Sequence, residues 1–412
     1  MEVIYTRCAG LDVHEAFIVV CRRILGPDGR LDKLVRRYST MTADLLAMGD
    51  WLAEAGVTHL AMESTGVFWK PVWNLLEDRF TILLVNPRDV KQVPGRKTDV
   101  ADAEWLAQLL QHGLLKSSFI PPVAIRELRD LTRHRTSLLH ERTRAVNRIH
   151  KVLEDANIKL SAVASDIMGV SGRAMLQAII AGESDAERLA DLARHTLRRK
   201  RPALRQALQG RVRSHHRFLL RTLLDHVGFL EEQIAQLDGH IEEQLRPFGR
   251  ELALIRTIPG LKHRAGESVL AEVGPEMTPF PSAAHLCSWA ALCPGHDETG
   301  GKQRSGKTRR GNRWLRGALT EAAWAAARTK RSYFAGQYRR LAGRRGKKRA
   351  IVAVSHSLLI AVYHVLRNQV PYHELGEQHF DRLAPMQLTR YLVKRLERLG
   401  HKVTLEPASV AA

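Results

Sequence analysis

Cysteine is scarce in this chain of 412 residues, which contains four cysteines and no CxxC pair. So few cysteines cannot form a disulfide framework, and we expect reduced thiols in a cytoplasmic protein. The first residues lack the basic stretch followed by an apolar one that marks a signal peptide. The most apolar late stretch, residues 350–366, contains two histidines and two serines, and we expect it to be too short and too polar to cross a bilayer. These absences predict a soluble protein without a membrane partner.

Acidic residues are outnumbered, with 43 Asp and Glu against 64 Lys and Arg, which gives a net charge of +21. A surplus of this size attracts polyanions, of which nucleic-acid phosphates are the commonest. Association with ribosomes or with a membrane surface would produce the same bias, so the charge alone does not select a function. The length predicts two or three domains rather than a single core.

The first part of the chain, residues 1–120, has an α/β pattern. Its strands are expected at Val3–Cys8, Ala16–Cys21, Leu34–Tyr38, His59–Met62 and Thr81–Val85, and its helices at 42–55, 67–78 and 100–112. The first three strands follow one another closely, as in a meander, whereas the later ones alternate with helices. This order predicts a mixed sheet that is covered by helices.

Residues 121–250 show no strand pattern and are expected to be helical. A first long helix over 123–155 interleaves arginine with leucine and valine. Further on, apolar residues recur at alternating steps of three and four, at Leu220, Leu223, Val227, Leu230, Ile234, Leu237 and Ile241. This heptad seam predicts a coiled coil, packed either within the chain or against a second copy.

The composition changes again at residue 251, and we divide the rest into a mostly helical domain over 251–375 and a tail over 376–412. Residues 302–349 contain 17 Lys or Arg and a single acid, Glu321. Blocks of like charge are usually solvated or disordered. Large apolar and aromatic residues are interleaved with this block, so we expect part of it to be folded.

Four acidic residues in the first domain have the spacing of a metal site. Asp12 and Glu63 each end an apolar strand, and Asp99 and Asp102 lie three residues apart at a helix start, so that both project from one face. Carboxylates gathered in this way repel one another unless cations neutralise them, and ligands made only of oxygen suit Mg²⁺ or Mn²⁺. Two such ions would activate an attacking oxygen and stabilise a leaving one during phosphoryl transfer.

Each of these acids also has a purely structural interpretation. Asp99 and Asp102 fit the first turn of a helix, with Thr98 or Asp99 as its N-cap, where the helix dipole favours negative charge. Any one acid of this kind is structural more often than catalytic. The combination of two strand ends and a DxxD pair in a basic chain favours the metal site.

Several segments of the sequence resemble one known family. They are GLDVH (10–14), AMESTG (61–66), VNPRDVKQVPGRKTDVADAEWLAQLL (85–110), IPGLKHRAGESVLAEVG (258–274), ALCPG (291–295) and SGKTRRGNRWLRGALTEAA (305–323). In this order, over residues 3 to about 375, they resemble the DEDD transposases of insertion-sequence family 110. The resemblance implies a RuvC-like, RNase H-like N-terminal domain, a coiled-coil middle and a C-terminal transposase domain.

The same resemblance implies a function. It implies a mobile-element recombinase of bacterial type, associated with the nucleoid, that cuts and joins element-end and target DNA and is guided by a structured bridge RNA. The four metal acids of the family fall on Asp12, Glu63, Asp99 and Asp102, and all four are present. The implied cofactor is Mg²⁺ or Mn²⁺.

The nucleophile implied by the resemblance is a serine a few residues past the CPG motif, and this sequence departs from the family there. It has Thr299 at that place, and a threonine hydroxyl can attack phosphorus although it is more hindered. Ser305, six residues further on, is the fallback nucleophile. A third interpretation is that this copy is catalytically impaired.

Candidates for nucleic-acid contact lie in both halves of the chain. The turn at Gly260 resembles a helix-hairpin-helix that offers backbone N–H groups to a phosphate, although an ordinary packed helix pair has the same pattern. Arg96 and Lys97, just ahead of the DxxD pair, are placed to steady the scissile strand. Residues 302–316 suit a loop and helix that hold DNA beside the nucleophile, through Lys302, Arg304, Lys307, Arg309, Arg310, Asn312, Arg313 and Arg316.

Three functions compete on this pattern. The leading one is a recombinase whose acidic site and distant hydroxyl form one composite centre, with a covalent protein–DNA link and a homodimer or homotetramer as its assembly. A structure-specific junction nuclease that hydrolyses with water would keep the metal site and form no such link. A basic coiled-coil scaffold for RNA or DNA would need no catalysis, and its acids would be structural.

Overall fold

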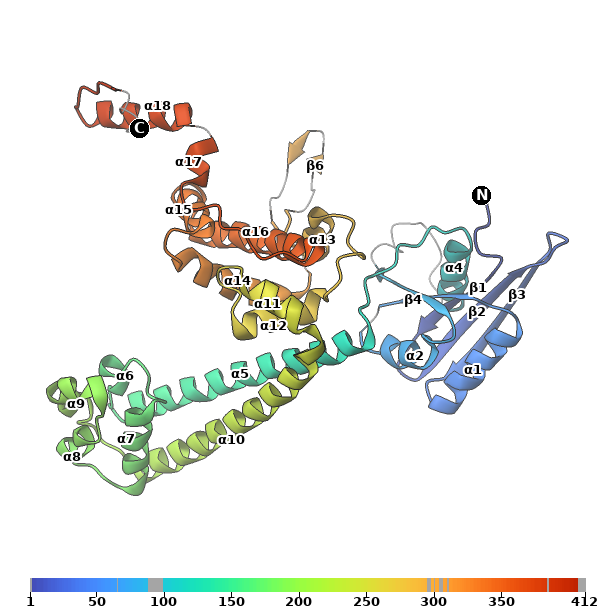
Figure 1. Ribbon diagram of the computed structural model, residues 1–412. Helices are drawn as coiled ribbons and strands as arrows, with labels where there is room; N and C mark the ends of the chain where they lie inside the picture. The colour runs from blue at the N-terminus through green and yellow to red at the C-terminus, as the bar shows by residue number, and fades with distance from the viewer. Residues whose placement is uncertain are drawn as a thin grey trace. The chain divides into compact units, whose positions relative to one another are not determined.

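The computed structural model describes residues 2–64, 66–87, 99–294, 298–299, 301–303, 307–309, 311–383 and 385–406 (Figure 1). The chain divides into two compact units, Met1–Ile120 and Pro121–Ala412. The first unit contains the mixed α/β sheet and the second is almost entirely helical, as predicted. Within the second unit, the divisions at residues 250 and 375 stay predictions.

The sheet of the first unit has the strand order β3-β2-β1-β4-β5. Its strands are β1 (Arg7–Val13), β2 (Phe17–Leu25), β3 (Leu31–Ser39), β4 (His59–Glu63) and β5 (Thr81–Val85). The first three form an antiparallel meander, while β4 lies parallel to β1 and β5 parallel to β4. The strand expected at Val3–Cys8 was placed too early, because β1 begins at Arg7 and continues to Val13.

Helices cover both faces of this sheet. Helices α1 (Thr42–Glu54) and α2 (Trp69–Leu76) bury one face, where Leu11 of β1 packs with Leu45 and Leu76. Helix α4 (Asp99–Gln111) covers the other face, where Cys8 forms a cluster with Ala61 and Leu110. Side chains alternate along a strand, so Cys8, Gly10 and Asp12 share the face of β1 that is turned toward α4.

Two long helices dominate the beginning of the second unit, α5 (Val123–Asp155) and α10 (Ser214–Leu245) (Figure 1). They run antiparallel, since Asp155 bonds His216 at one end of the pair and Arg135 bonds Asp238 at the other. The apolar seam of α10 packs on α5 of the same chain, where Leu138, Leu230 and Ile234 form one buried cluster. Of the two predicted partners for the heptad seam of α10, the structure therefore contains the one within the same chain, α5.

Smaller helices connect the far ends of this pair. They are α6 (Leu160–Val163), α7 (Val170–Ala181), α8 (Ala186–Asp191), η1 (His195–Lys200) and α9 (Arg201–Ala207). Their core is continuous with the ends of α5 and α10 through Ile149, Leu176 and Leu220. The helical prediction for 121–250 is confirmed.

The rest of the second unit contains one long apolar helix, α16 (Lys347–Asn368), against which α11, α13, α14 and α15 pack. Its other elements are η2 (Arg246–Phe248), α11 (Gly249–Arg256), α12 (His263–Val273), α13 (Ala283–Trp289), β6 (Glu298–Thr299), β7 (Lys302–Gln303), α14 (Arg313–Arg328), α15 (Tyr333–Arg345), α17 (His379–Leu383) and α18 (Pro385–Arg398). Helix α16 is the one helix in the described ranges that is long and apolar enough to cross a membrane, so the expectation that this stretch is too short and polar was wrong. Its most apolar window is 56% buried inside the unit, and packing in the core accounts for its composition.

Candidate active site

An acidic cluster lies where the end of β1 meets the start of α4. The Nε2 atom of His14 lies 2.9 Å from Oδ2 of Asp12 and 3.8 Å from Oδ1 of Asp99. The three side chains present ligand atoms that all lie within 4.8 Å of one another. Asp12 and Asp99, which are 87 residues apart in the sequence, therefore lie close together in the fold.

Glu63 ends the strand next to β1, and the register of the two strands indicates on which face its side chain lies. Leu11 of β1 pairs with Met62 of β4, so the next step along these parallel strands sets Asp12 next to Glu63. Residues aligned in register project to the same face of a sheet, about 4.8 Å apart. Asp99 and Asp102 both lie in the first turn of α4, and the charge of Asp102 acts on Asp12. Among the described residues, Asp12 and Asp99 are the two predicted acids in the close group of ligand atoms, and a common site for all four acids stays a prediction.

The carboxyl group of Asp12 is the least exposed member of the cluster, with 18% of its side chain accessible. Burial raises the pKa of Asp12 above its ordinary value, His14 lowers it through a hydrogen bond and its charge, and Asp102 and Asp99 raise it. Like charges near a half-buried carboxylate favour its neutral form unless a cation compensates them. The oxygen-rich donor set therefore fits a hard divalent cation such as Mg²⁺ or Mn²⁺.

Histidine 14 is a member of this cluster that the sequence reasoning missed. Its backbone N–H donates to the carbonyl of Phe17, and its ring stacks on the Phe17 ring with centroids 4.6 Å apart. The ring is thus held in place while it bonds Asp12. The available signal was its position two residues after Asp12 on an extended segment, which puts both side chains on one face.

The predicted nucleophile loop is described only in part. Thr299 lies in β6 and pairs with Lys302 in β7, forming a two-stranded hairpin whose base is closed by a bridge between Pro294 and Thr308. The candidates Arg96, Lys97, Arg304, Ser305 and Arg310 lie outside the described residues. The backbone of Thr299 is therefore extended and belongs to a two-stranded hairpin, which is called the β6–β7 ribbon below.

Two of the predicted phosphate-binding arginines fasten the base of this ribbon. Arg309 donates to the Ser288 hydroxyl of α13 at 3.1 Å. Arg316, in the first turn of α14, donates to the Arg309 carbonyl and to the Thr308 hydroxyl. Lys307 is exposed beside them. These guanidinium groups hold the loop onto the helices, and a contact with DNA stays a prediction for them.

Asn312 and Gly260 both have packing roles. Asn312 is the N-cap of α14, where its Oδ1 accepts from the N–H groups of Trp314 and Leu315 and its Nδ2 donates to buried Glu272. Gly260 has a φ of 89°, and a Cβ there would lie 2.3 Å from the carbonyl oxygen of Ala322. The missing side chain at Gly260 thus lets the turn approach the backbone of α14 closely. This close packing agrees with the interpretation of the motif as an ordinary packed helix pair.

Comparison with known proteins identifies the family. A model of the DEDD transposases of IS110 matches residues 9–158, and a model of the transposase IS116/IS110/IS902 family matches residues 252–339. An uncharacterised 42 kDa protein of insertion element IS900 from Mycobacterium paratuberculosis is 30% identical, over 67% of this chain and 73% of its own length. The chain belongs to the IS110 family of transposases.

Two other relatives of this transposase carry functional names. A probable family 20 transposase of Pseudomonas aeruginosa is 26% identical over 77% of the chain and 80% of its own length. The pilin gene-inverting protein of Moraxella bovis is 28% identical over 36% of the chain and 48% of its own length. The first family model spans all four acids, and the second spans the β6–β7 ribbon and α14. Membership in this family makes the chain a DNA-processing enzyme.

Proposed function

We propose that this transposase cuts and rejoins DNA with divalent metal ions held by Asp12, Glu63, Asp99 and Asp102. The observation that carries the proposal is the approach of Asp12 and Asp99 to one histidine. Continuing the register of β1 and β4 by one residue beyond Leu11 and Met62 would set Glu63 next to Asp12. Bound Mg²⁺ would polarise a phosphodiester and lower the pKa of an attacking hydroxyl. His14 positions the Asp12 carboxylate through their hydrogen bond.

The sheet topology supports a RuvC-like, RNase H-like assignment for the first unit. An antiparallel meander, β1 to β3, is extended from β1 by the parallel strands β4 and β5. In such a fold the acids at the ends of β1 and β4 and on a following helix share one edge. Asp12, Glu63 and Asp99 stand at these three places.

The hydroxyl of Thr299 is the proposed nucleophile, with Ser305 as the alternative. Its oxygen forms a bond to phosphorus, the bond between phosphorus and one deoxyribose oxygen breaks, and the proton lost by the threonine ends on the released DNA hydroxyl or in solvent. A DNA hydroxyl from the other strand then attacks the phosphothreonine and restores Thr299. Holding that strand end in place makes the rejoining step effectively intramolecular.

The proposed partners are element-end and target DNA, a structured guide RNA and further copies of the chain in a homodimer or homotetramer. The net charge of +21 supports binding to nucleic-acid phosphates. The seam of α10 on α5 supports an antiparallel two-stranded coiled coil within the chain. In bacteria such an enzyme would be associated with the nucleoid.

The experiment incubates the full chain with element-end DNA, guide RNA and Mg²⁺ and measures a denaturation-resistant protein–DNA adduct. We expect an adduct that disappears in Thr299→Ala, survives in Ser305→Ala and requires the metal. Asp12→Asn should abolish it, whereas Asp78→Asn, an exposed acid of the same unit, should not. Cleavage without adduct would favour a junction nuclease, and neither product would favour a scaffold. An active Asp12→Asn variant would refute the metal assignment.

A further inference from the structure

His14 adds a nitrogen ligand atom to the oxygen atoms of the acidic cluster at the end of β1. Its Nε2 lies 2.9 Å from Oδ2 of Asp12 and 3.8 Å from Oδ1 of Asp99. Ligand atoms bound at about 2.1 Å on neighbouring corners of an octahedron are about 3 Å apart, and on opposite corners about 4.2 Å. The distance to Asp12 agrees with neighbouring corners, and the distance to Asp99 lies between the two values. Small side-chain movements would therefore let one ion contact all three atoms.

The ring of His14 is held in this position by contacts that involve neither acid. The backbone N–H of His14 donates to the carbonyl of Phe17 at 2.9 Å, and the two rings stack with centroids 4.6 Å apart. The Arg37 guanidinium on β3 lies 3.7 Å from the centre of the Phe17 ring. A side chain that is already held in place loses little conformational freedom when it binds an ion.

The hydrogen bonding of this ring leaves Nε2 available to a metal ion. Within the described ranges, the ring makes one hydrogen bond, between Nε2 and Asp12. The side chain of His14 is 39% exposed, so Nδ1 can hold the ring proton and donate it to water. A neutral imidazole with its proton on Nδ1 has a lone pair on Nε2. An ion bound by both side chains would take the place of their hydrogen bond.

A second group of possible ligand atoms, where the ends of α5 and α10 meet, differs in this respect. Asp155, His215 and His216 also present ligand atoms within 4.8 Å of one another. The Nδ1 atom of His216 accepts from the backbone N–H of Arg213, while its Nε2 bonds Asp155. A metal ion on Nε2 would require the ring proton on Nδ1, where it would face that backbone N–H. This second group is therefore a suitable control for the first.

We propose that His14 is a metal ligand beside Asp12 and Asp99, and that its nitrogen makes the site prefer Mn²⁺ to Mg²⁺. Mg²⁺ is a hard ion that binds through oxygen. An imidazole nitrogen is a softer donor and favours transition-metal ions, among which Mn²⁺ also suits carboxylates. The proposal rests on the proposed function, since it concerns the same metal site.

A metal ligand differs in its expected effects from a residue that only positions Asp12. His14→Gln keeps an N–H that can bond Asp12 but removes the imidazole nitrogen. If His14 only positions Asp12, the affinities for Mn²⁺ and Mg²⁺ should change by the same factor. If His14 is a ligand, Mn²⁺ affinity should fall at least about tenfold, since even residues behind a metal ligand contribute that much, and Mg²⁺ affinity should fall less.

The test adds Mn²⁺ alone to the full chain and measures electron paramagnetic resonance. The signal of free Mn²⁺ during a titration gives the Mn²⁺ affinity, and displacement by Mg²⁺ gives the Mg²⁺ affinity. A directly coordinated nitrogen modulates the electron spin echo of bound Mn²⁺. At saturating Mn²⁺ we expect this modulation in the wild type and its loss in His14→Gln. The control His215→Gln, in the second group, should retain it.

The outcomes separate the role of His14 from the proposed function. Bound Mn²⁺ without nitrogen modulation in the wild type, or modulation that survives His14→Gln, would overturn the ligand role, as would equal losses of Mn²⁺ and Mg²⁺ affinity. Formation of the protein–DNA adduct with Mn²⁺ is scored on the same preparations. Modulation that His14→Gln removes, without any adduct in the wild type, would count against the proposed function alone. An adduct without modulation would count against the ligand role alone.

Discussion

Gly10 of β1 lies directly against the backbone of α4, so closely that a Cβ on Gly10 would be 2.4 Å from the carbonyl oxygen of Ala103. The same atom would be 2.4 Å from the backbone nitrogen of Ala107. Backbone atoms cannot turn aside as a flexible side chain can. The absence of a side chain at Gly10 therefore determines how closely α4, with Asp99 and Asp102 in its first turn, lies over the end of β1.

Gly10→Ala should push α4 away from the sheet and weaken the acidic cluster. Overpacking of this kind costs about 1–3 kcal/mol, and we expect that loss in the stability of the first unit, measured by hydrogen exchange of the β1 amides. Divalent-metal binding should weaken in parallel. Gly228→Ala, in an open position on α10, is the control and should be neutral or slightly stabilising. Unchanged exchange in Gly10→Ala would mean that α4 does not pack as described.

Glu272→Gln should be among the most destabilising single changes in the second unit. Glu272 is 1% exposed and accepts from Nε and Nη2 of Arg133, at 2.7 and 2.8 Å. Burial lowers the pKa of Arg129 to about 10, and the charge of Glu272 acts in the opposite direction. Breaking a buried ion pair by removing one partner costs about 3–5 kcal/mol.

Hydrogen exchange of the α12 amides is the measurement for this variant. Glu232→Gln removes an exposed carboxylate on α10 and should change stability by less than about 0.5 kcal/mol. Similar effects of the two substitutions would show that the Glu272 ion pairs contribute no more than a surface charge.

The cysteines should differ sharply in reactivity. Burial raises the pKa of Cys8 to about 12, that of Cys21 to about 11 and that of Cys287 to about 12. At about pH 8 these thiols are almost entirely protonated and covered, and the thiolate is the nucleophile. We expect iodoacetamide to modify the half-buried Cys293 in the native protein and all four cysteines after denaturation. Native labelling of Cys8 at the rate of Cys293 would contradict the packing of α4 on β1.

The strand and helix pattern was enough to predict the mixed sheet and the helical remainder, because hydrophobic periodicity reports local burial. It failed at the first strand. Ala9 and Gly10 are small residues that are depleted in strands, so the pattern ended the strand at Cys8. At Gly10 there is no room for a side chain because α4 packs close to β1, and this contact joins residues about a hundred positions apart.

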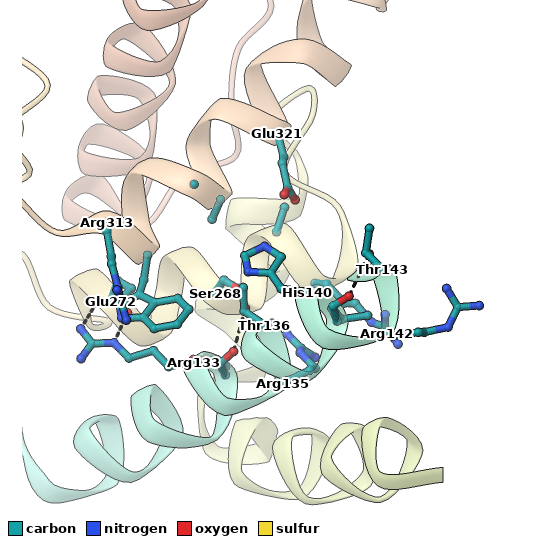
Figure 2. A pocket seen from close by; sticks show the side chains of 17 residues that line it. Arg133, Arg135, Thr136, His140, Arg142, Thr143, Ser268, Glu272, Arg313 and Glu321 are labelled. Carbon is teal, nitrogen blue, oxygen red and sulfur yellow. Dashed lines mark hydrogen bonds and ion pairs between the residues drawn. The ribbon is translucent and has the colours of Figure 1, made fainter. Parts of the chain in front are cut away.

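Features built by several distant segments could be predicted only where the fold itself brings the segments together. A cavity lined by Arg135 combines side chains from three helices, α5, α12 and α14 (Figure 2), and no local pattern in any of them indicates a concave surface. The spacing of His14 from Asp12 indicates only that the two side chains share a face, and the approach of Asp99, which makes His14 part of a cluster, comes from a distant segment. The acids could be proposed as a group because strand ends and a helix start gather at one edge of such a sheet.

Substitutions at Asn312 should show whether this residue acts as a helix cap or as a DNA contact. Its Oδ1 caps α14 and its Nδ2 donates to Glu272. Asn312→Ser should retain much of the cap, while Asn312→Ala should lose it at a cost of about 1 kcal/mol. Asn312→Asp keeps the acceptor for the cap but sets a second carboxylate against buried Glu272, and we expect it to be the least stable of the three.

Thermal unfolding of the three variants, followed by circular dichroism, gives their order of stability. An order of Ser above Ala above Asp supports the cap and its bond to Glu272. If Asn312 served only to contact phosphate, all three variants would unfold at the same temperature as the wild type. They would differ from it only in a lower DNA affinity, which would be lowest for Asn312→Asp because of its negative charge. Stability therefore decides the question before any DNA is added.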